Sequence, residues 1–374
     1  MLVQTLQHIA CPGTSNISCG GLLEVRDIKS RAVFRGGFEE IAAGELECNN
    51  CGHDYPIVGG IAILVPDWRA YLVARANLLT RLPPNALPDN VLRLGLWRKP
   101  ETPPTEDIEW ESSEILESYL LNQFLCFNAD QLDDLEDIFS SKLILDSVRS
   151  LWMNGPYFTL REHLSRLGGC SRILEIGCSV GGGLHLLEEF VHETAIGADL
   201  SLRAVAVARR MMLQIGSPLL ESDRLAQAVA ALSEEVTERV RCPFLDFIVA
   251  DGTLPPVARR HWDVLSSINV IDVTNNPRQM AERSVDLLRT GGMIYLTAPF
   301  SIRSPLSRRL SAVKYSNESD DLVHRVITMF CEKGLQLKSI VQDLPWIIPR
   351  GPRYIELLSV DALTFSQHNI SEGP

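Results

Sequence analysis

Residues 172–186 constrain the fold of this chain more than any other stretch, and they read RILEIGCSVGGGLHL. The apolar start predicts a β-strand, residues 177–183 form a glycine-rich turn, and a helix is expected over 184–190. Glycines at such a strand end let the backbone approach a ligand closely, and the start of the next helix offers unpaired N–H groups. The stretch therefore predicts an α/β fold with a nucleotide-type ligand at the carboxyl end of this strand.

An acid distinguishes this loop from loops that bind dinucleotides. Those enzymes use G-x-G-x-x-G, with the second glycine against a pyrophosphate. This chain has Gly177, Ser179 and Gly181, and it places Glu175 two residues ahead of the first glycine. A buried carboxylate there would repel a pyrophosphate and suit a cation. The pattern resembles motif I of the class I S-adenosylmethionine methyltransferases, where the acid faces the methionine ammonium or a neighbouring amide.

Two further strand ends carry acids that suit the same ligand. Residues 195–199 end in Asp199, 18 positions after Gly181, where a nucleotide-binding α/β fold places a carboxylate on the ribose hydroxyls. The alternative is that Asp199 or Ser201 serves as the N-cap of the following helix. A second apolar run ends in Asp251. In class I methyltransferases such an acid hydrogen-bonds the adenine amino group.

Strands and helices alternate through the rest of the chain. We expect a fourth strand at 262–271, and within 287–297 a helix end, a Gly-Gly turn and a fifth strand. A final pair of strands is expected at 335–342 and 354–365 on either side of 345–350. The alternation predicts a doubly wound parallel sheet with its ligand at the strand carboxyl ends. An antiparallel last pair is the usual ending of the class I methyltransferase fold. The predicted fold class is therefore α/β, with a Rossmann-like methyltransferase sheet.

Three parts are expected along the chain: a small zinc-ribbon-like β domain at 1–66, a helical connector at 67–155 and the methyltransferase domain at 156–374. Helices are predicted in the connector at 113–127 and 130–153. In methyltransferases such helices cap the active site and help to shape the substrate pocket. The alternative is that they serve only to pack against the rest of the domain. An extra amphipathic helix at 222–240 is expected to serve packing or dimer formation, so a homodimer is one expectation.

The methyltransferase resemblance implies a role for each strand-end residue. It assigns the methionine end of S-adenosylmethionine to Glu175, Gly177, Cys178, Ser179 and Gly181, the ribose to Asp199 with Leu200, and adenine to Asp251 with Gly252. Asn269 and Asp272, just beyond the fourth strand, would face the methyl group and are the candidate catalytic residues, with Asn269 also contacting the cofactor. The competing role for Asp272 is a helix N-cap. Methyl transfer is an in-line displacement that depends chiefly on positioning, although an amine acceptor gains from a hydrogen-bond acceptor.

The N-terminal cysteines predict a metal site. Cys48 and Cys51 form a C-x-x-C pair that can hold one side of a tetrahedral Zn²⁺, and Cys11 and Cys19 are the candidates for the other side. The alternative is a metal-free ribbon with reduced cysteines. With Tyr55-Pro-Ile and a following Gly-Ile strand, the segment resembles the small zinc-ribbon family that accompanies or activates methyltransferases, although its first cysteine pair is spaced more widely. A zinc this far from motif I would be structural.

A narrower resemblance covers roughly residues 115–365. The glycine loop, the segment Asn269-Val-Ile-Asp272, Leu296-Thr-Ala-Pro and Asp343-Leu-Pro-Trp through Arg350 are similar to the mercaptohistidine N-methyltransferase family, which methylates an imidazole nitrogen in ovothiol biosynthesis. Where that family has a His and a second Tyr ahead of motif I, this chain has Gln123 and Phe124. If that segment contacts the substrate, a different substrate is implied.

Charge and composition narrow the class of partner. The formal net charge of −12 argues against a broad phosphate-binding face. No apolar run is long enough to span a bilayer and no signal peptide is evident, so no membrane partner is expected. Nine cysteines, an odd number, indicate thiols of a cytoplasmic protein.

Three functions follow as hypotheses. The first is an S-adenosylmethionine-dependent methyltransferase acting on nitrogen of a small amino-acid-derived or biosynthetic molecule. The second is a methyltransferase of RNA or protein that docks its substrate through the zinc ribbon. The third is a non-catalytic scaffold that keeps the methyltransferase fold.

Overall fold

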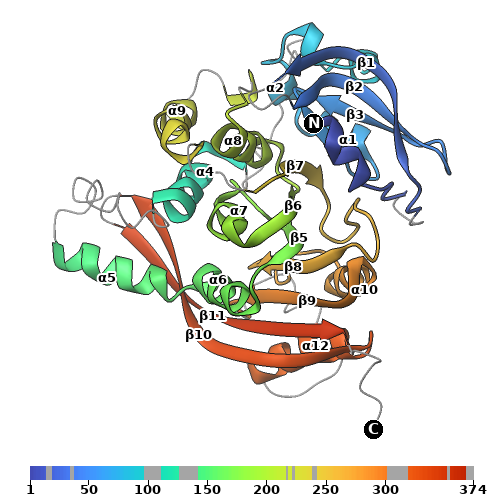
Figure 1. Ribbon diagram of the computed structural model, residues 1–374. Helices are drawn as coiled ribbons and strands as arrows, with labels where there is room; N and C mark the ends of the chain where they lie inside the picture. Colours follow the sequence, from blue (N-terminus) through green and yellow to red (C-terminus); the bar gives the residue numbers. More distant parts are fainter. Residues whose placement is uncertain are drawn as a thin grey trace.

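The structure is a computed structural model that describes residues 1–13, 19–33, 38–96, 111–125, 142–215, 218–220, 224–237, 242–300, 319–351 and 354–367. Figure 1 shows one large twisted sheet with helices on both faces. The sheet runs in the order β1-β2-β3-β4-β7-β6-β5-β8-β9-β11-β10. Both the α/β class and the Rossmann-like arrangement predicted from the sequence are confirmed.

The centre of the sheet is parallel. Its strands are β5 (Cys170–Ile176), β6 (Val191–Asp199), β7 (Leu245–Ala250), β8 (Trp262–Ile268) and β9 (Leu288–Ala298). The last two strands, β10 (Leu335–Gly351) and β11 (Tyr354–Gln367), form the expected antiparallel pair. The prediction that 345–350 lies between two strands is wrong. Those residues extend β10, where Pro345 and Pro349 pair with Ser359 and Ile355 of β11, so the hairpin is longer than its apolar pattern indicated.

The N-terminal unit continues the same sheet. Its strands β1 (Leu23–Val33), β2 (Glu39–Cys48), β3 (Asp54–Val58) and β4 (Ile61–Leu64) are antiparallel, and β4 then pairs in parallel with β7 through Ile63 and Leu64. Without β4, strand β7 would present an unpaired edge, which is a ready site for unwanted strand pairing. The N-terminal unit therefore covers one edge of the methyltransferase sheet. The boundaries predicted at 66 and 155 stay a prediction.

A buried ion cluster fixes this junction. Arg209 of α8 (Leu202–Leu213) donates to Asp246 of β7 and, at 2.5 Å, to Glu40 of β2. Asp246 also accepts from Thr5 Oγ1 at 2.5 Å and from the Leu2 backbone N–H at 3.0 Å. These side chains are almost wholly buried. Since a buried charge is tolerated only when it is paired, the cluster holds the two units in one relative position.

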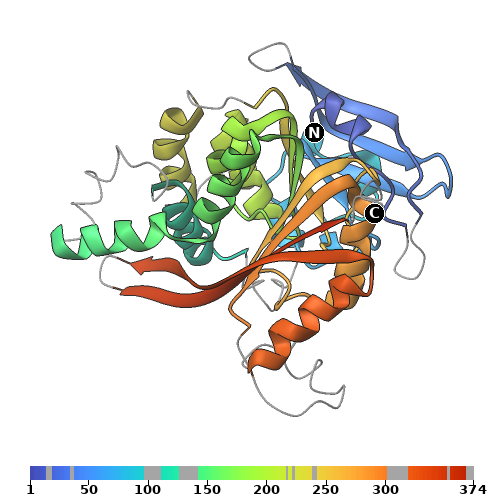
Figure 2. The same cartoon turned by 60° about the horizontal axis from the view of Figure 1, so that its bottom comes forward.

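The helices form two layers, as Figures 1 and 2 show from two sides. On one face lie α6 (Pro156–Leu167), α7 (Gly182–Leu187) and α8, and on the other lie α10 (Pro277–Leu287) and α12 (Ser319–Cys331). The remaining helices of the described residues are α1 (Trp68–Val73), α2 (Ala76–Leu79), α3 (Asp89–Leu92), α4 (Ser113–Leu120), α5 (Lys142–Met153) and α9 (Arg224–Thr237), with short turns at Val3–Gln7, Pro84–Ala86, Leu121–Leu125, Glu188–Phe190 and Pro218–Leu220. None of the described helices is long and apolar enough to cross a membrane.

The connector and the extra helix agree with their predictions as far as they are described. Helix α4 and the turn Leu121–Leu125 occupy most of the expected 113–127 helix, and α5 is the described part of the helix expected at 130–153. Residues 126–141 lie outside the described residues. The helix expected at 222–240 is α9, which packs on α8 and α4 of the same chain, as its packing role requires.

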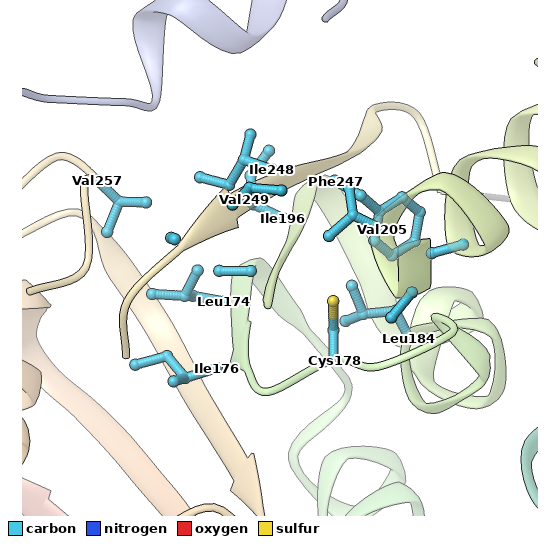
Figure 3. Packing of buried hydrophobic residues seen from close by; sticks show 14 of the residues in the cluster. Leu174, Ile176, Cys178, Leu184, Ile196, Val205, Phe247, Ile248, Val249 and Val257 are labelled. Atoms are coloured by element: carbon cyan, nitrogen blue, oxygen red, sulfur yellow. The ribbon is translucent and has the colours of Figure 1, made fainter. Parts of the chain in front are cut away.

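The core beneath the glycine loop is apolar and closely packed. Figure 3 shows Leu174 and Ile176 of β5, Ile196 of β6 and Phe247 of β7 in one cluster with Val205 of α8. The sulfur of Cys178 points into this cluster from the loop. Its side chain is fully buried, and burial raises the thiol pKa well above its usual value. Any contact of Cys178 with a ligand would thus come from its backbone.

Candidate active site

The glycine loop connects β5 to α7 at the carboxyl end of the central strand. Gly177 and Gly181 have φ of 79° and 88°, and Ser179 between them has φ of 48°. A Cβ on Gly177 would lie 2.1 Å from Val270 Cγ2, and one on Gly181 would lie 2.9 Å from Ala208 Cβ. Both positions therefore require glycine for backbone conformation and for packing. Ser179 adopts the left-handed conformation at a cost, which is typical of functional loops.

Glu175 lies directly beneath the start of α7. The side chain is fully buried, and Tyr157 of α6 donates its hydroxyl to Oε1 at 2.9 Å. Among the described residues the other oxygen, Oε2, has no hydrogen-bond partner. Burial raises the pKa of this carboxyl to about 8, against the opposing effect of the Tyr157 hydrogen bond. An unpaired buried acid at a ligand loop fits a cation such as an ammonium group.

Asp199 connects the loop to the end of β6. Its Oδ2 accepts from the Ser179 backbone N–H and its Oδ1 from that of Ser201, each at 2.8 Å. Burial nevertheless raises its pKa. The N-cap of α8 is Ser201, whose side chain accepts from Ala204 N. The N-cap alternative is therefore confirmed for Ser201 and wrong for Asp199. Leu200 is exposed at its side chain, and its carbonyl accepts from the Tyr71 hydroxyl at 2.7 Å.

Asp251 follows β7 at the same edge. Its Oδ1 accepts from both the backbone N–H and the hydroxyl of Thr253, at 2.8 and 2.7 Å. These bonds fix the carboxylate and leave Oδ2 without a bond among those described. Gly252 approaches the end of β5, where an added Cβ would lie 2.7 Å from Ile176 Cγ2. Asp251 and Gly252 therefore lie just beyond the carboxyl end of β7, and their contact with adenine stays a prediction.

Asn269 and Asp272 lie beyond the end of β8. Asn269 has φ of 57°, and its Oδ1 accepts from Thr297 Oγ1 at 3.0 Å, so its Nδ2 is aimed elsewhere. Within the described part of the chain, both Asn269 Nδ2 and Asp272 Oδ1 are buried without a hydrogen-bond partner. Burial raises the pKa of Asp272. The N-cap of α10 is Asn276, which accepts from Gln279 N. The N-cap alternative for Asp272 is therefore wrong.

Three residues that the sequence did not assign to the cofactor also belong to this edge. Tyr157 holds Glu175, and Gln123 Oε1 accepts from the Gly182 backbone N–H at 3.0 Å. Burial raises the pKa of Tyr119, and Arg350 of β10 lies close enough to oppose that rise. Gln123 lay in a segment that the sequence had pointed to, whereas Tyr157 followed no motif and could be found only from the packing of α6 on β5.

The four N-terminal cysteines form one cluster. The sulfurs of Cys11, Cys19, Cys48 and Cys51 all lie within 4.8 Å of one another. Cys11 Sγ is 3.7 Å from Cys51 Sγ, and Cys19 Sγ is 3.6 Å from Cys48 Sγ. A tetrahedral zinc with bonds of about 2.3 Å requires sulfurs about 3.8 Å apart. The cluster is therefore compatible with a metal ion, and it is the one such group of His, Cys, Asp and Glu in the described residues.

A family comparison identifies the class of protein. Residues 115–342, more than half of the chain, match the model of a methyltransferase domain family. The chain belongs to this family of S-adenosylmethionine-dependent methyltransferases and is an enzyme of that class. The match covers α4, the glycine loop and all five parallel strands of the central sheet.

Solved structures with a related fold are only distantly similar in sequence. The N-methyltransferase NodS from Bradyrhizobium japonicum, in complex with S-adenosylhomocysteine, is 17% identical over 57% of this chain and 89% of its own, with a TM-score of 0.34. Magnesium protoporphyrin IX methyltransferase from Synechocystis, with the same ligand, is 13% identical over 65% and 96%, with a TM-score of 0.36. A chain from the complex between the Haloferax volcanii Trm112 methyltransferase activator and a methyltransferase is 14% identical over 65% of this chain and 96% of its own, with a TM-score of 0.37. No curated protein matches the chain.

Proposed function

We propose that this enzyme transfers a methyl group from S-adenosylmethionine to a nitrogen of a small, amino-acid-derived or biosynthetic molecule. The observation that carries this proposal is a pair of buried polar groups, Asn269 Nδ2 and Asp272 Oδ1, which lie three positions apart just beyond the end of β8 and have no hydrogen-bond partner among the described residues. One donor and one acceptor suit a polar small molecule. The resemblance of this segment to the mercaptohistidine N-methyltransferases supports the same class.

The residues around the loop would hold the cofactor, which supplies an activated methyl group on its sulfonium. Glu175, with its unpaired Oε2, is suited to the methionine ammonium, while the backbone of Gly177, Cys178, Ser179 and Gly181 would line that end. Asp199 with Leu200 is proposed for the ribose, and Asp251 with Gly252 for adenine. Each carboxylate is already oriented by backbone or side-chain donors of the protein, which reduces the reorganisation needed on binding.

On the acceptor side, Asp272 and Asn269 would orient the nucleophile. An amine attacks through its lone pair, so a hydrogen bond to Asp272 would align the amine and accept its proton during transfer. Burial raises the pKa of Asp272, which makes this carboxylate a better proton acceptor than an exposed aspartate. Asn269 Nδ2 can donate to the acceptor or to the cofactor.

Two observations weigh on the alternative substrates. The net charge of −12 disfavours RNA, since RNA binding depends on neutralising phosphates with Lys and Arg. The N-terminal unit, the proposed docking module for a macromolecule, is joined to β7 by strand pairing and by the Arg209 cluster. Those contacts give it a structural role. A scaffold without catalysis is disfavoured by Glu175 Oε2, Asn269 Nδ2 and Asp272 Oδ1, which are buried without a partner among the described residues.

The test is transfer of labelled methyl groups from S-adenosylmethionine into a cell extract separated into small-molecule, RNA and protein pools. Label in the small-molecule pool, lost in Asp272→Asn, is expected. Label confined to RNA or protein would contradict the proposal. Absence of label in every pool, together with no measurable binding of S-adenosylmethionine, would favour a scaffold.

We further propose a structural Zn²⁺ held by Cys11, Cys19, Cys48 and Cys51, consistent with a cytoplasmic protein whose thiols stay reduced. The fit rests on sulfurs spaced 3.6–3.7 Å within the two closest pairs. Gly21 supports the same cluster, because a Cβ there would lie 2.7 Å from Cys48 Sγ. With four protein thiolates no coordination position remains open, so the ion would stabilise the fold and take no part in catalysis.

Metal analysis of the purified enzyme tests this site. About one zinc per chain is expected, reduced to a small fraction in Cys48→Ser, while Cys331→Ser, at an exposed cysteine far from the cluster, keeps it. A metal-free protein whose thermal unfolding is unaffected by chelators would contradict the zinc proposal and favour the metal-free ribbon.

A further inference from the structure

A short π-helical turn connects the cofactor loop with the long C-terminal hairpin. The turn spans Leu121–Leu125 and follows α4 directly. It carries two consecutive buried amides, Asn122 and Gln123, each 2% exposed. Single π-helical turns occur frequently at functional sites, and a buried amide is costly unless it is hydrogen-bonded. The partners of these two side chains therefore indicate what the turn does.

Gln123 contacts the first residue of α7. Its Oε1 accepts from Gly182 N at 3.0 Å. The contact is close along the backbone as well, because a Cβ on Gly182 would lie 2.4 Å from Gln123 Cβ and 2.6 Å from its carbonyl oxygen. On the other side of α7, a Cβ on Gly183 would lie 2.6 Å from Glu175 Oε1. The start of α7 is thus held between Gln123 and the acid proposed for the cofactor.

Asn122 contacts the hairpin instead. Its Nδ2 donates to the carbonyl of Ile347 in β10. The neighbouring residue Trp346 packs its ring 5.8 Å from that of Tyr157, whose hydroxyl binds Glu175. The same stretch of β10 leads to Arg350, which lies near Tyr119. The charge of Asp272 also acts on the pKa of Tyr119, so this part of β10 lies near a residue proposed for the acceptor.

We propose that Gln123 is a positioning residue and that the Asn122–Gln123 pair couples the cofactor loop to β10. The inference rests on the proposed function, because it takes S-adenosylmethionine as the ligand of the loop. Two adjacent side chains in one helical turn cannot move independently. A displacement of α7 on cofactor binding is consequently transmitted through the turn to β10, which orders the acceptor side only when the methyl donor is present. Such coupling is reciprocal between the two sites.

The probe is S-adenosylhomocysteine, and the measurements are its affinity by calorimetry and backbone hydrogen exchange of residues 344–351. In the wild type we expect the ligand to slow exchange in this segment. Gln123→Ala should weaken binding by about threefold to tenfold, as loss of one buried hydrogen bond predicts, and should abolish the slowing. Asn122→Ala should also abolish the slowing and leave the affinity within about twofold.

Two further variants separate positioning from simple stability. Gln123→Glu keeps an oxygen acceptor at Gly182 N and should restore both affinity and slowing, since a carboxylate is also favourable at a helix start. Gln279→Ala, on the outer surface of α10, should behave as the wild type. Slowing that persists in Gln123→Ala and Asn122→Ala would overturn the coupling alone. Failure of the wild type to bind S-adenosylhomocysteine would overturn the proposed function, and this inference with it.

Discussion

Two groups of buried carboxyls lie on the same sheet and have opposite surroundings. At the junction with the N-terminal unit, Glu40 and Asp246 both receive hydrogen bonds from Arg209. Near the carboxyl ends of the parallel strands, Glu175 and Asp272 each keep one oxygen without a partner among the described residues. No arginine or lysine of the described chain forms an ion pair with either of them, and burial raises both pKa values.

This difference separates structure from function. A buried acid paired with a buried cation is complete, and its removal costs stability. A buried acid without a cation destabilises the empty protein, so its presence requires another reason, and the simplest is a cationic ligand. We therefore assign Glu40 and Asp246 to holding the two units together, and propose Glu175 and Asp272 for binding. The following predictions test this assignment, from the largest expected effect to the smallest.

Removing the junction cation should have the largest effect. Arg209→Met leaves two carboxylates buried near each other, and the free energy of unfolding should fall by about 3–5 kcal/mol. Urea denaturation measures the loss. Arg210→Met, the next residue of α8, is the matched control because Arg210 is only partly buried and bonds a single carbonyl. If Arg209→Met unfolds too readily to measure, Arg209→Lys should show an intermediate loss. Wild-type stability in both Arg209→Met and Arg209→Lys would contradict the structural role of this cluster.

Neutralising Glu175 should change the free energy of unfolding in the opposite direction and stabilise the protein. The folded-state pKa of Glu175 is raised from 4.5 to about 8, so its favourable contribution is full below pH 4.5 and is lost as pH rises through 8. Glu175→Gln removes that penalty and should stabilise the empty protein by on the order of 2–4 kcal/mol near pH 8. The gain should shrink towards pH 5.

The same variant should bind the cofactor less well. S-adenosylmethionine binding to the wild type near pH 7 should release a proton, because the cationic ligand favours ionised Glu175. Calorimetry in buffers of different ionisation enthalpy measures that release. Glu175→Gln should bind at least about tenfold more weakly and release no proton from this site. A stabilised variant with unchanged affinity would show that Glu175 is not a cofactor ligand.

Asp199 should show a smaller effect on binding. An asparagine cannot accept from both Ser179 N and Ser201 N, since one side of its amide is a donor. Asp199→Asn should weaken S-adenosylhomocysteine binding by about tenfold, with Asp286→Asn, an exposed residue of α10, as the control. Equal affinities in the two variants would remove Asp199 from the proposed site.

The smallest effect concerns a histidine pair, His8 and His261, near the amino ends of the parallel strands. His8 Nδ1 lies 3.0 Å from His261 Nε2. Burial, His261 and Arg172 lower the pKa of His8 from 6.5 to about 4, against the opposing charge of Glu193, and burial lowers that of His261. The neutral forms are favoured by folding, so stability should be full above pH 6.5 and fall as pH drops towards 4. His8→Asn should reduce this loss by on the order of 1 kcal/mol at pH 5. An unchanged pH profile would exclude His8 as its source.

Local pattern determined much of this protein. The alternation of strands and helices, the acid before Gly177 and the acids after two further strands were all visible in sequence, because apolar periodicity and glycine requirements act over a few residues. The carboxyl ends of β6 and β7 lie within two residues of the positions predicted from the sequence. The four cysteines also lay in recognisable positions, and the structure gathers them.

The sequence could not show which distant residues complete the site. Tyr157 reaches Glu175 across 18 positions, Gln123 reaches Gly182 across 59, and Asn122 reaches Ile347 across 225. No periodicity encodes such pairs, because they arise from how helices pack on the sheet. Pattern also failed at 345–350, which was predicted to lie between two strands, because β10 continues there by pairing with β11.

The sequence by itself determined the fold class, the glycine loop and the acids at the strand ends, since these depend on local backbone preferences and on residue chemistry. The tertiary structure alone decided which acids are paired and which are left open. Arg209 lies 37 positions from Asp246 and 169 from Glu40, and only the packing of α8 between the two units brings that cation to one group of carboxyls and leaves the other without one.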